Sequence, residues 1–195
     1  MRVSELARDA GLIEPRRYVV DWARVESELG TGLPSDYKDF VYWFGPGNFS
    51  DYFTVSVPGV ENSNVDFMSN VRAEWNAYNV RNGVDDLPPV PFQFFPQPGG
   101  WLPFLVTVEG CAVFWVTEGD DPDRWTIGSR NRMWRPQFFD GGFSDFLRQA
   151  IWDTIELEAI PEYGHEPPLA FRSNDGSWRG GGGTRLEAYG CFEEA

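Results

Sequence analysis

The sequence predicts an α+β fold, in which helices pack on a twisted, antiparallel-dominated sheet. Three observations predict this class. Two short amphipathic segments precede the first strand-like run, several strand-like runs in the second half are joined by short turns, and a strongly amphipathic segment follows them. Because short connections join antiparallel neighbours, we expect an antiparallel sheet with an N-terminal helix pair and a C-terminal helix.

The chain is long enough for one domain with a hydrophobic core. It has 195 residues, of which 42% are hydrophobic and 16% aromatic, so apolar burial can offset the entropy of ordering the chain. We expect residues 1–20 to form an arm or short helix and residues 21–160 to form the domain. Residues 161–195, rich in Gly and Pro, are expected either to pair "LAFRS" with "TRLEAYG" as a hairpin or to form a mobile tail.

Two short helices are expected at the start of the domain. In "DWARVESELG", Asp21 is a candidate N-cap, Trp22, Val25 and Leu29 share one face, and Gly30 falls where a C-terminal cap would lie. The segment "LPSDYKDFVYWFG" follows at once, and its apolar residues repeat at helical spacing before a glycine. The two helices should meet at the tight corner "TGLP".

The middle of the chain alternates between strand, helix and loop signals. The run "YFTVSV" at residues 52–57 alternates as a strand does, and residues 65–78 carry an apolar stripe at helical spacing that includes Trp75. The stretch "DDLPPVPFQFFPQPGG" holds five of the 15 prolines. Because proline removes a backbone donor and fixes φ, this stretch should be an irregular loop.

The second half predicts consecutive strands followed by a helix. Strands are expected at residues 102–108, 112–118 and 125–128, and "NRMWRPQFF" would add another strand, confined by Pro136 to a sheet edge. The final helix lies in "GGFSDFLRQAIWDTIELE", which has apolar residues at helical spacing up to Ile155 and Ser144 near its start.

The aromatic residues on these apolar faces are expected to build the core. Trp75 and Trp152 fall on apolar helical stripes, so much of the tryptophan should be buried with them. The residues assigned to the structural core are Trp22, Leu33, Tyr37, Phe40, Trp115 and Phe146.

The net charge of −14 argues against nucleic acid as a direct ligand, because such binding depends on basic side chains. Residues 21–160 hold 9 basic and 21 acidic residues and therefore −12 of this charge, which suits a basic partner. The sequence contains no apolar run of membrane-spanning length and no signal-peptide pattern, so we expect no membrane association and a cytoplasmic location.

Metal and nucleophilic sites have little support in the residue types present. Cys111 and Cys191 lie 80 residues apart without a CxxC pattern, and His165 is the only histidine, so neither a zinc site nor a disulfide framework is indicated. Free, mostly buried thiols are the simpler interpretation. We expect no metal, no cofactor and no catalytic role for His165.

The acidic run "EGDDPDRW" at residues 118–125 has three interpretations. Its carboxylates lack the spacing of an EF-hand loop, and Gly, Asp and Pro are typical of a solvated turn between strands. A glycoside hydrolase is the main enzymatic alternative, since paired carboxylates beside sugar-stacking tryptophans define such sites. The tryptophans near Asp120, Asp121 and Asp123 are Trp115, Trp125 and Trp134.

Several of these features, in their order along the chain, resemble the SUKH superfamily of bacterial immunity proteins. The similarity spans roughly residues 21–156, and it begins with "DWARVESELGTGLPSDYKDFVYWFGPG". The residues there that carry it are Trp22, Glu26, Leu29, Gly30, Leu33, Pro34, Asp36, Tyr37, Lys38, Phe40 and Gly45. In the second half they are Leu102, Pro103, Phe104, Gly110, Phe114, Trp115, Pro122, Asp123, Arg124, Trp125 and the helix at residues 143–147.

The resemblance implies a non-catalytic protein that binds and blocks a cognate polymorphic toxin, often a nuclease or a nucleotide-directed enzyme. Carboxylates would steer a basic toxin toward the surface. The expected contact residues are Glu118, Asp120, Asp121 and Asp123, with Glu61, Asp85 and Asp86. A non-catalytic cell-wall or carbohydrate-related role, which the resemblance also allows, and an acidic scaffold domain remain alternatives.

Overall fold

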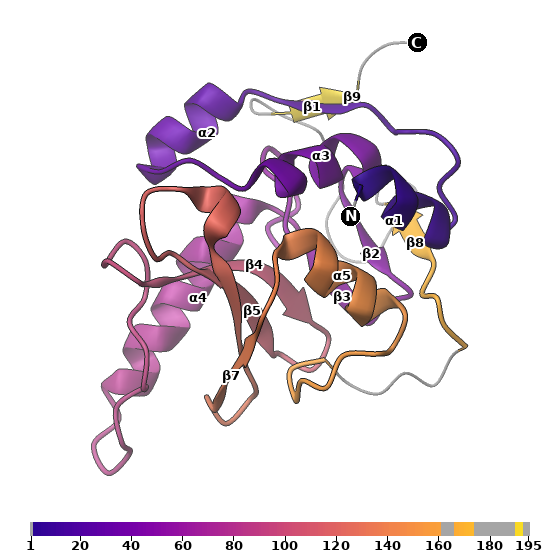
Figure 1. Ribbon diagram of the computed structural model, residues 1–195. Helices are drawn as coiled ribbons and strands as arrows, with labels where there is room; N and C mark the ends of the chain where they lie inside the picture. Colours follow the sequence, from indigo (N-terminus) through magenta and orange to yellow (C-terminus); the bar gives the residue numbers. More distant parts are fainter. Residues whose placement is uncertain (1, 161–165, 174–189, 193–195) are drawn as a thin grey trace.

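The computed structural model describes residues 2–160, 166–173 and 190–192, and it is an α+β fold built on a seven-stranded antiparallel sheet (Figure 1). The order of the strands is β7-β6-β5-β4-β3-β2-β8. Their bounds are β2 Gly47–Phe49, β3 Phe53–Val55, β4 Trp101–Thr107, β5 Ala112–Val116, β6 Thr126–Arg130, β7 Pro136–Phe139 and β8 Phe171–Ser173. The predicted fold class is therefore confirmed, and β7 is the edge strand that Pro136 indicated.

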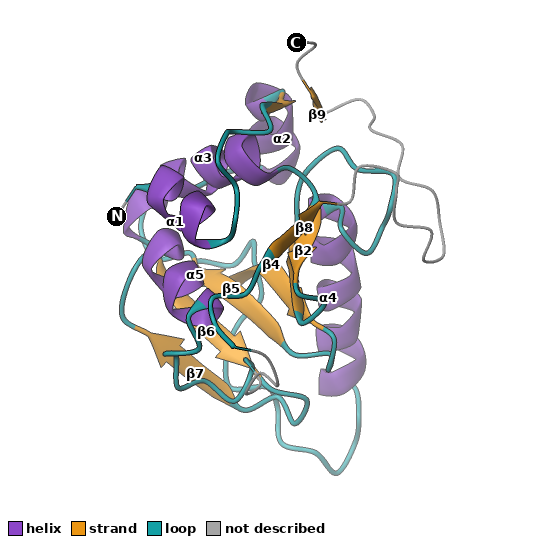
Figure 2. Cartoon of the chain, turned by 90° about the vertical axis from the view of Figure 1, so that its right-hand side faces the viewer, coloured by secondary structure: helices purple, strands orange, loops and turns teal. Residues whose placement is uncertain are grey.

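Helices cover both faces of this sheet. The described helices are α1 Val3–Asp9, α2 Trp22–Leu29, α3 Ser35–Phe44, α4 Phe67–Asn82 and α5 Phe143–Ile151, with a single 3₁₀ turn, η1, at Pro122–Arg124. Figures 1 and 2 show α1, α3 and α5 on one face and α4 on the other. A separate two-stranded sheet of β1 (Tyr18–Val20) and β9 (Gly190–Phe192) lies beside α2 and α3.

Strand β5 is buried along its whole length because both of its faces are covered. Val113 and Trp115 belong to the main core beneath the helices, whereas Ala112, Phe114 and Val116 belong to a second core on the opposite face. This alternation is the period of two expected of a strand between two layers.

The proline-rich loop closes the second core. It forms neither a helix nor a strand, as predicted, yet Val90, Phe92 and Phe94 are buried against the sheet. Phe92 stacks on Trp101 with ring centroids 3.9 Å apart. The loop therefore covers this face of the sheet, although it contains no helix or strand.

Glu26 holds the corner between α2 and α3. Its carboxylate accepts a hydrogen bond from the backbone N–H of Leu33 at 2.8 Å and pairs with Lys38 at 2.5 Å. Tyr37 donates its O–H to the carbonyl of Ser56 at 2.6 Å and meets Trp115 edge to face. Two residues that carry the SUKH resemblance thus make joining contacts: Glu26 joins α2 to α3, and Tyr37 joins α3 to the sheet.

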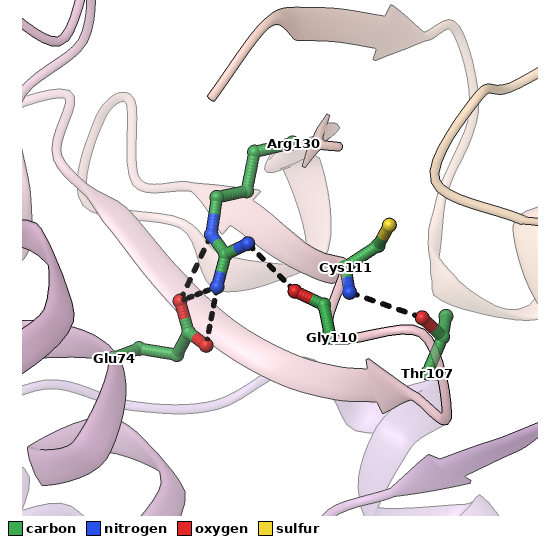
Figure 3. A network of polar contacts seen from close by, with 5 residues as sticks. All are labelled: Glu74, Thr107, Gly110, Cys111 and Arg130. Atoms are coloured by element: carbon green, nitrogen blue, oxygen red, sulfur yellow. Dashed lines mark hydrogen bonds and ion pairs between the residues drawn. The ribbon is translucent and has the colours of Figure 1, made fainter. Parts of the chain in front are cut away.

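A buried ion pair ties α4 to the other face of the sheet. The guanidinium of Arg130 binds both carboxylate oxygens of Glu74 at 2.7 Å and donates to the carbonyl of Gly110 at 2.9 Å (Figure 3). It also lies 4.3 Å from the centre of the Trp134 ring. Beside it, the buried Cys111 donates its backbone N–H to Thr107 Oγ1, and the side chain of Cys191 lies outside the described part.

The N-terminal segment forms the short helix that was one of its two predicted alternatives. Val3, Leu6, Ala7 and Ala10 are buried in the main core, so residues 3–10 pack as part of the domain and not as an arm. The described strands of the C-terminal segment do not pair with each other, since β8 pairs with β2 and β9 pairs with β1. The hairpin predicted between "LAFRS" and "TRLEAYG" depends on residues 184–189, which lie outside the described part.

Not all of the tryptophans expected in the core are buried there. Trp75 is 42% exposed, and its ring stacks on Tyr78 of the same helix. Trp152 is 37% exposed because α5 ends at Ile151, which also leaves Ile155 outside the helix. Trp22 is half-buried against Tyr37, whereas the other assigned core residues are fully buried, namely Leu33, Tyr37, Phe40, Trp115 and Phe146.

Candidate functional site

The acidic run at residues 118–123 is the exposed turn between β5 and β6, as the turn interpretation predicted. Glu118, Asp120, Asp121 and Asp123 are all exposed. Asp121 accepts a hydrogen bond from the backbone N–H of Asp123 at the start of η1, and Trp125 donates its indole N–H to the carbonyl of Gly119. The turn is therefore held in one conformation by its own side chains.

Asp123 also fixes the start of α3. Its Oδ1 accepts a hydrogen bond from the backbone N–H of Ser35 at 2.5 Å. Pro34 at the N-cap position provides no side-chain acceptor, and the first N–H groups of a helix have no partner within the helix. Asp123 supplies that partner, so this acid has a structural role besides any contact with a protein.

Asp36, in the first turn of α3, does the same for α5. Its Oδ2 accepts a hydrogen bond from the backbone N–H of Ser144 at 2.9 Å, and the N-cap residue Gly142 has no side chain to offer. The acidic turn, the start of α3 and the start of α5 are thereby joined in one chain of capping interactions.

These three segments enclose a cavity of about 220 Å³, here called the helix-terminus pocket. Its apolar wall includes three buried aromatic side chains, Trp115, Trp125 and Phe143. The lining residues are Pro34, Ser35, Asp36, Trp115, Pro122, Asp123, Trp125, Gly142 and Phe143. The lining holds two carboxylates and, among its described residues, no basic side chain.

The electrostatics of the pocket combine two helix N-termini with carboxylates. Each N-terminus carries a partial positive charge, which the capping carboxylates offset. In Asp36 and in Asp123, one carboxylate oxygen accepts the capping N–H. Within the described residues, no hydrogen bond or ion pair reaches the other oxygen. The nearby cation Lys38 is already paired with Glu26. The pocket therefore has unused acceptor capacity.

The predicted contact acids do not all lie on one surface. Glu61 precedes α4, whereas Asp85 and Asp86 follow it. Because α4 has 16 residues, its ends lie about 24 Å apart. Figure 1 shows the loop after α4 projecting away from the end of the molecule where α2 lies. The seven acids thus cannot form one compact patch, and Asp123 is the one of the seven that lines the pocket.

The tryptophans grouped by the hydrolase alternative are also separated. Trp115 and Trp125 belong to the main core, whereas Trp134 packs against the second core on the opposite face of the sheet. These three side chains do not form one sugar-stacking platform. Within residues 2–160, 166–173 and 190–192, no group of three or more His, Cys, Asp or Glu side chains could hold a metal ion.

Sequence reasoning missed Asp36 as a pocket residue. It was noted only as part of the SUKH resemblance, because its role depends on α5, which begins 107 residues later. A weak signal was present, since both Pro34 and Gly142 lack a side-chain acceptor at a helix start. Such starts require an acceptor from elsewhere, although the sequence does not identify its source.

A second cavity lies on the α4 side of the molecule. It has a volume of about 280 Å³ and is mostly apolar, with Trp75 and Phe95 in its wall and the exposed ion pair of Arg72 and Glu28 at its rim. No feature of its lining selects one occupant.

Comparisons with protein families, with curated proteins and with solved structures gave no significant match to this chain. Each helix in the described part is too short or too polar to cross a bilayer.

Proposed function

We propose that this chain is a SUKH-type immunity protein, which binds a basic cognate toxin and occludes it without catalysing a reaction. The toxin would be a nuclease or a nucleotide-directed enzyme, and the complex would form in the cytoplasm of the producing cell. The observation that carries the proposal is the joining of the acidic turn to α3 and α5, which places exposed acids beside a pocket whose described lining includes no basic group.

The fixed geometry of this end supports a binding role. The hydrogen bonds of Asp121 and Trp125 hold the turn in place before any partner arrives. A preorganised surface loses less conformational entropy on binding. Its exposed carboxylates would raise the rate at which a basic surface is encountered, and this effect weakens as salt screens the charges.

The positions of the residues that carry the SUKH resemblance also support it. Glu26, Leu33 and Lys38 form one polar cluster at the helix corner, and Tyr37 packs on Trp115. When a resemblance reflects a shared fold, the residues that carry it are expected to contact one another, as these do.

Co-expression with the product of the gene directly upstream tests the proposal. We expect that product to be lethal alone, to be neutralised by this chain, and to form a complex at low salt that weakens as salt is added. The double substitution Asp120→Asn/Asp121→Asn should lower the association rate at low salt by about tenfold. The matched double substitution Asp85→Asn/Asp86→Asn, which removes equal charge from the projecting loop, should leave that rate nearly unchanged. If the lethal product is not neutralised and no complex forms at low salt, the proposal is wrong.

A further inference from the structure

We propose that the helix-terminus pocket binds the guanidinium group of an arginine side chain presented by the partner. The identity of the partner rests on the proposed function, whereas the chemistry of the pocket rests on its own residues. The pocket unites two partly used carboxylates and an aromatic wall, and one of its wall residues, Trp115, has a buried indole N–H without a partner among the described residues.

The carboxylates define the charge of the occupant. The second oxygens of Asp36 and Asp123 make no hydrogen bond within the described residues, where each carboxylate accepts only its capping N–H. An ionised carboxylate can accept about four hydrogen bonds. A cationic donor placed between them would form charge-assisted hydrogen bonds without displacing either helix cap.

The walls define the shape of the occupant. Trp115, Trp125 and Phe143 are at most 4% exposed and bring aromatic surface to the cavity, and Pro34 and Pro122 complete an apolar lining. A guanidinium group is planar, stacks on aromatic faces and is less strongly hydrated than an ammonium group. These properties favour arginine over lysine in a cavity that mixes aromatic surface with carboxylates.

The volume limits the occupant to a single side chain. At about 220 Å³, the cavity is smaller than the range of roughly 300–1,000 Å³ that is usual for drug-sized ligands. It is open at the surface beside the exposed Asp123, so that a side chain can enter from a partner.

The indole N–H of Trp115 is a buried donor that lacks an acceptor among the described residues. Trp115 lines the pocket and is 1% exposed, and its Nε1 is buried with no hydrogen-bond partner among the described residues. Buried donors are nearly always paired in folded proteins. Because this nitrogen is buried even from the cavity, an acceptor would reach it only if the indole turns, and the indole N–H resonance of Trp115 would report that movement.

The test uses the intact protein and small probes, and it follows the indole N–H resonances of Trp115 and Trp125 in an assigned nitrogen-correlated NMR spectrum. The probes are N-acetylarginine methylamide and its neutral citrulline analogue, which has nearly the same shape. We expect the arginine probe to shift both resonances at millimolar concentration, and the citrulline probe to shift neither to a comparable extent.

Substitutions that keep the caps separate binding from folding. Asp36→Asn and Asp123→Asn retain an oxygen that can accept the capping N–H, since Asn is as good an N-cap as Asp. Each should raise the dissociation constant of the arginine probe about tenfold, the loss expected for one hydrogen bond to a charged group. The control Asp120→Asn removes an exposed acid of the same turn that does not line the pocket, and it should change the constant less than twofold.

Either of two results would overturn the inference: equal shifts with the citrulline probe, or no shift at Trp115 and Trp125 with the arginine probe. An equal loss of affinity in Asp120→Asn and Asp123→Asn would also overturn it, because that result indicates general electrostatic attraction. If the probe fails but the toxin is still neutralised, the pocket inference is wrong and the proposed function stands. If the probe binds and no toxin is neutralised, the proposed function is wrong and the pocket inference stands.

Discussion

The carboxylate of Asp123 accepts a hydrogen bond from the backbone N–H of Ser35, although the two residues lie 88 positions apart in the chain. This bond joins the turn between β5 and β6 to the start of α3. Asp36 then extends the connection to Ser144 at the start of α5. The charges that we expect to face a partner are therefore fixed by the same hydrogen bonds that cap two helices.

Removing the cap at Asp123 should destabilise the fold. We expect Asp123→Ala to lower the free energy of unfolding by about 1 kcal/mol, because the N–H of Ser35 loses its acceptor. Asp123→Asn should cost less than half of this. Urea unfolding followed by tryptophan fluorescence measures both. Asp120→Ala, a change at an exposed acid that caps nothing, should stay within about 0.5 kcal/mol of the unmodified chain, and an equal loss there would contradict the capping role.

Breaking the buried ion pair between Glu74 of α4 and Arg130 should lower the free energy of unfolding more than removing the Asp123 cap does. Glu74→Ala leaves the guanidinium of Arg130 buried without its carboxylate, and we expect a loss of about 3–5 kcal/mol. The matched change Glu28→Ala breaks the exposed pair with Arg72 and should cost about 1 kcal/mol or less. Thermal or urea unfolding measures the difference. Similar losses in the two variants would show that Glu74 does not anchor α4.

The protein should lose stability in alkaline solution through Tyr37. Burial raises the pKa of the Tyr37 phenol well above its ordinary value, and the nearby Asp66 and Tyr18 raise it further. The unfolded chain releases this proton near pH 10 whereas the folded chain retains it, so the contribution is fully present below pH 10 and is lost as the pH rises toward the folded pKa. We expect the free energy of unfolding to fall more steeply above pH 10 in the unmodified chain than in Tyr37→Phe. The control Tyr42→Phe, at an exposed position, should keep the steeper slope. Equal slopes in all three chains would contradict the prediction.

Replacing a buried tryptophan should cost more stability than replacing a partly exposed one. Trp115 is 1% exposed and contacts both Tyr37 and Phe104, so Trp115→Ala should cost about 3–5 kcal/mol. Trp75→Ala should cost less than half of that, because 42% of Trp75 is exposed. Denaturant midpoints measure both values, and the reverse order would contradict the assignment of Trp115 to the core.

The parts of the fold that the sequence predicts are those that local patterns specify. Asp21 caps α2 and Gly30 ends it in the left-handed region, as expected, and the antiparallel neighbours β4, β5 and β6 follow from their short turns. Strands β1, β2 and β8 have three residues each, which is too short for a period of two to be recognised. They exist because a distant strand pairs with each of them.

The candidate site was only partly predictable for the same reason. The acids of the turn and the aromatic residues beside it stand close in the sequence, so the turn was recognised. The pocket itself needs the starts of α3 and α5 to meet that turn, and those contacts join Asp123 to Ser35 and Asp36 to Ser144 across long stretches of chain. The exposure of Trp75 was missed because a helical stripe does not indicate how far the neighbouring layer extends.

Hydrogen exchange of the chain, free and in complex with the neutralised toxin, tests the central claim most directly. The account predicts slower exchange at residues 34–36, 118–124 and 142–145, which border the helix-terminus pocket, and unchanged exchange at residues 80–87 after α4. Slower exchange confined to residues 80–87, with none around the pocket, would contradict it.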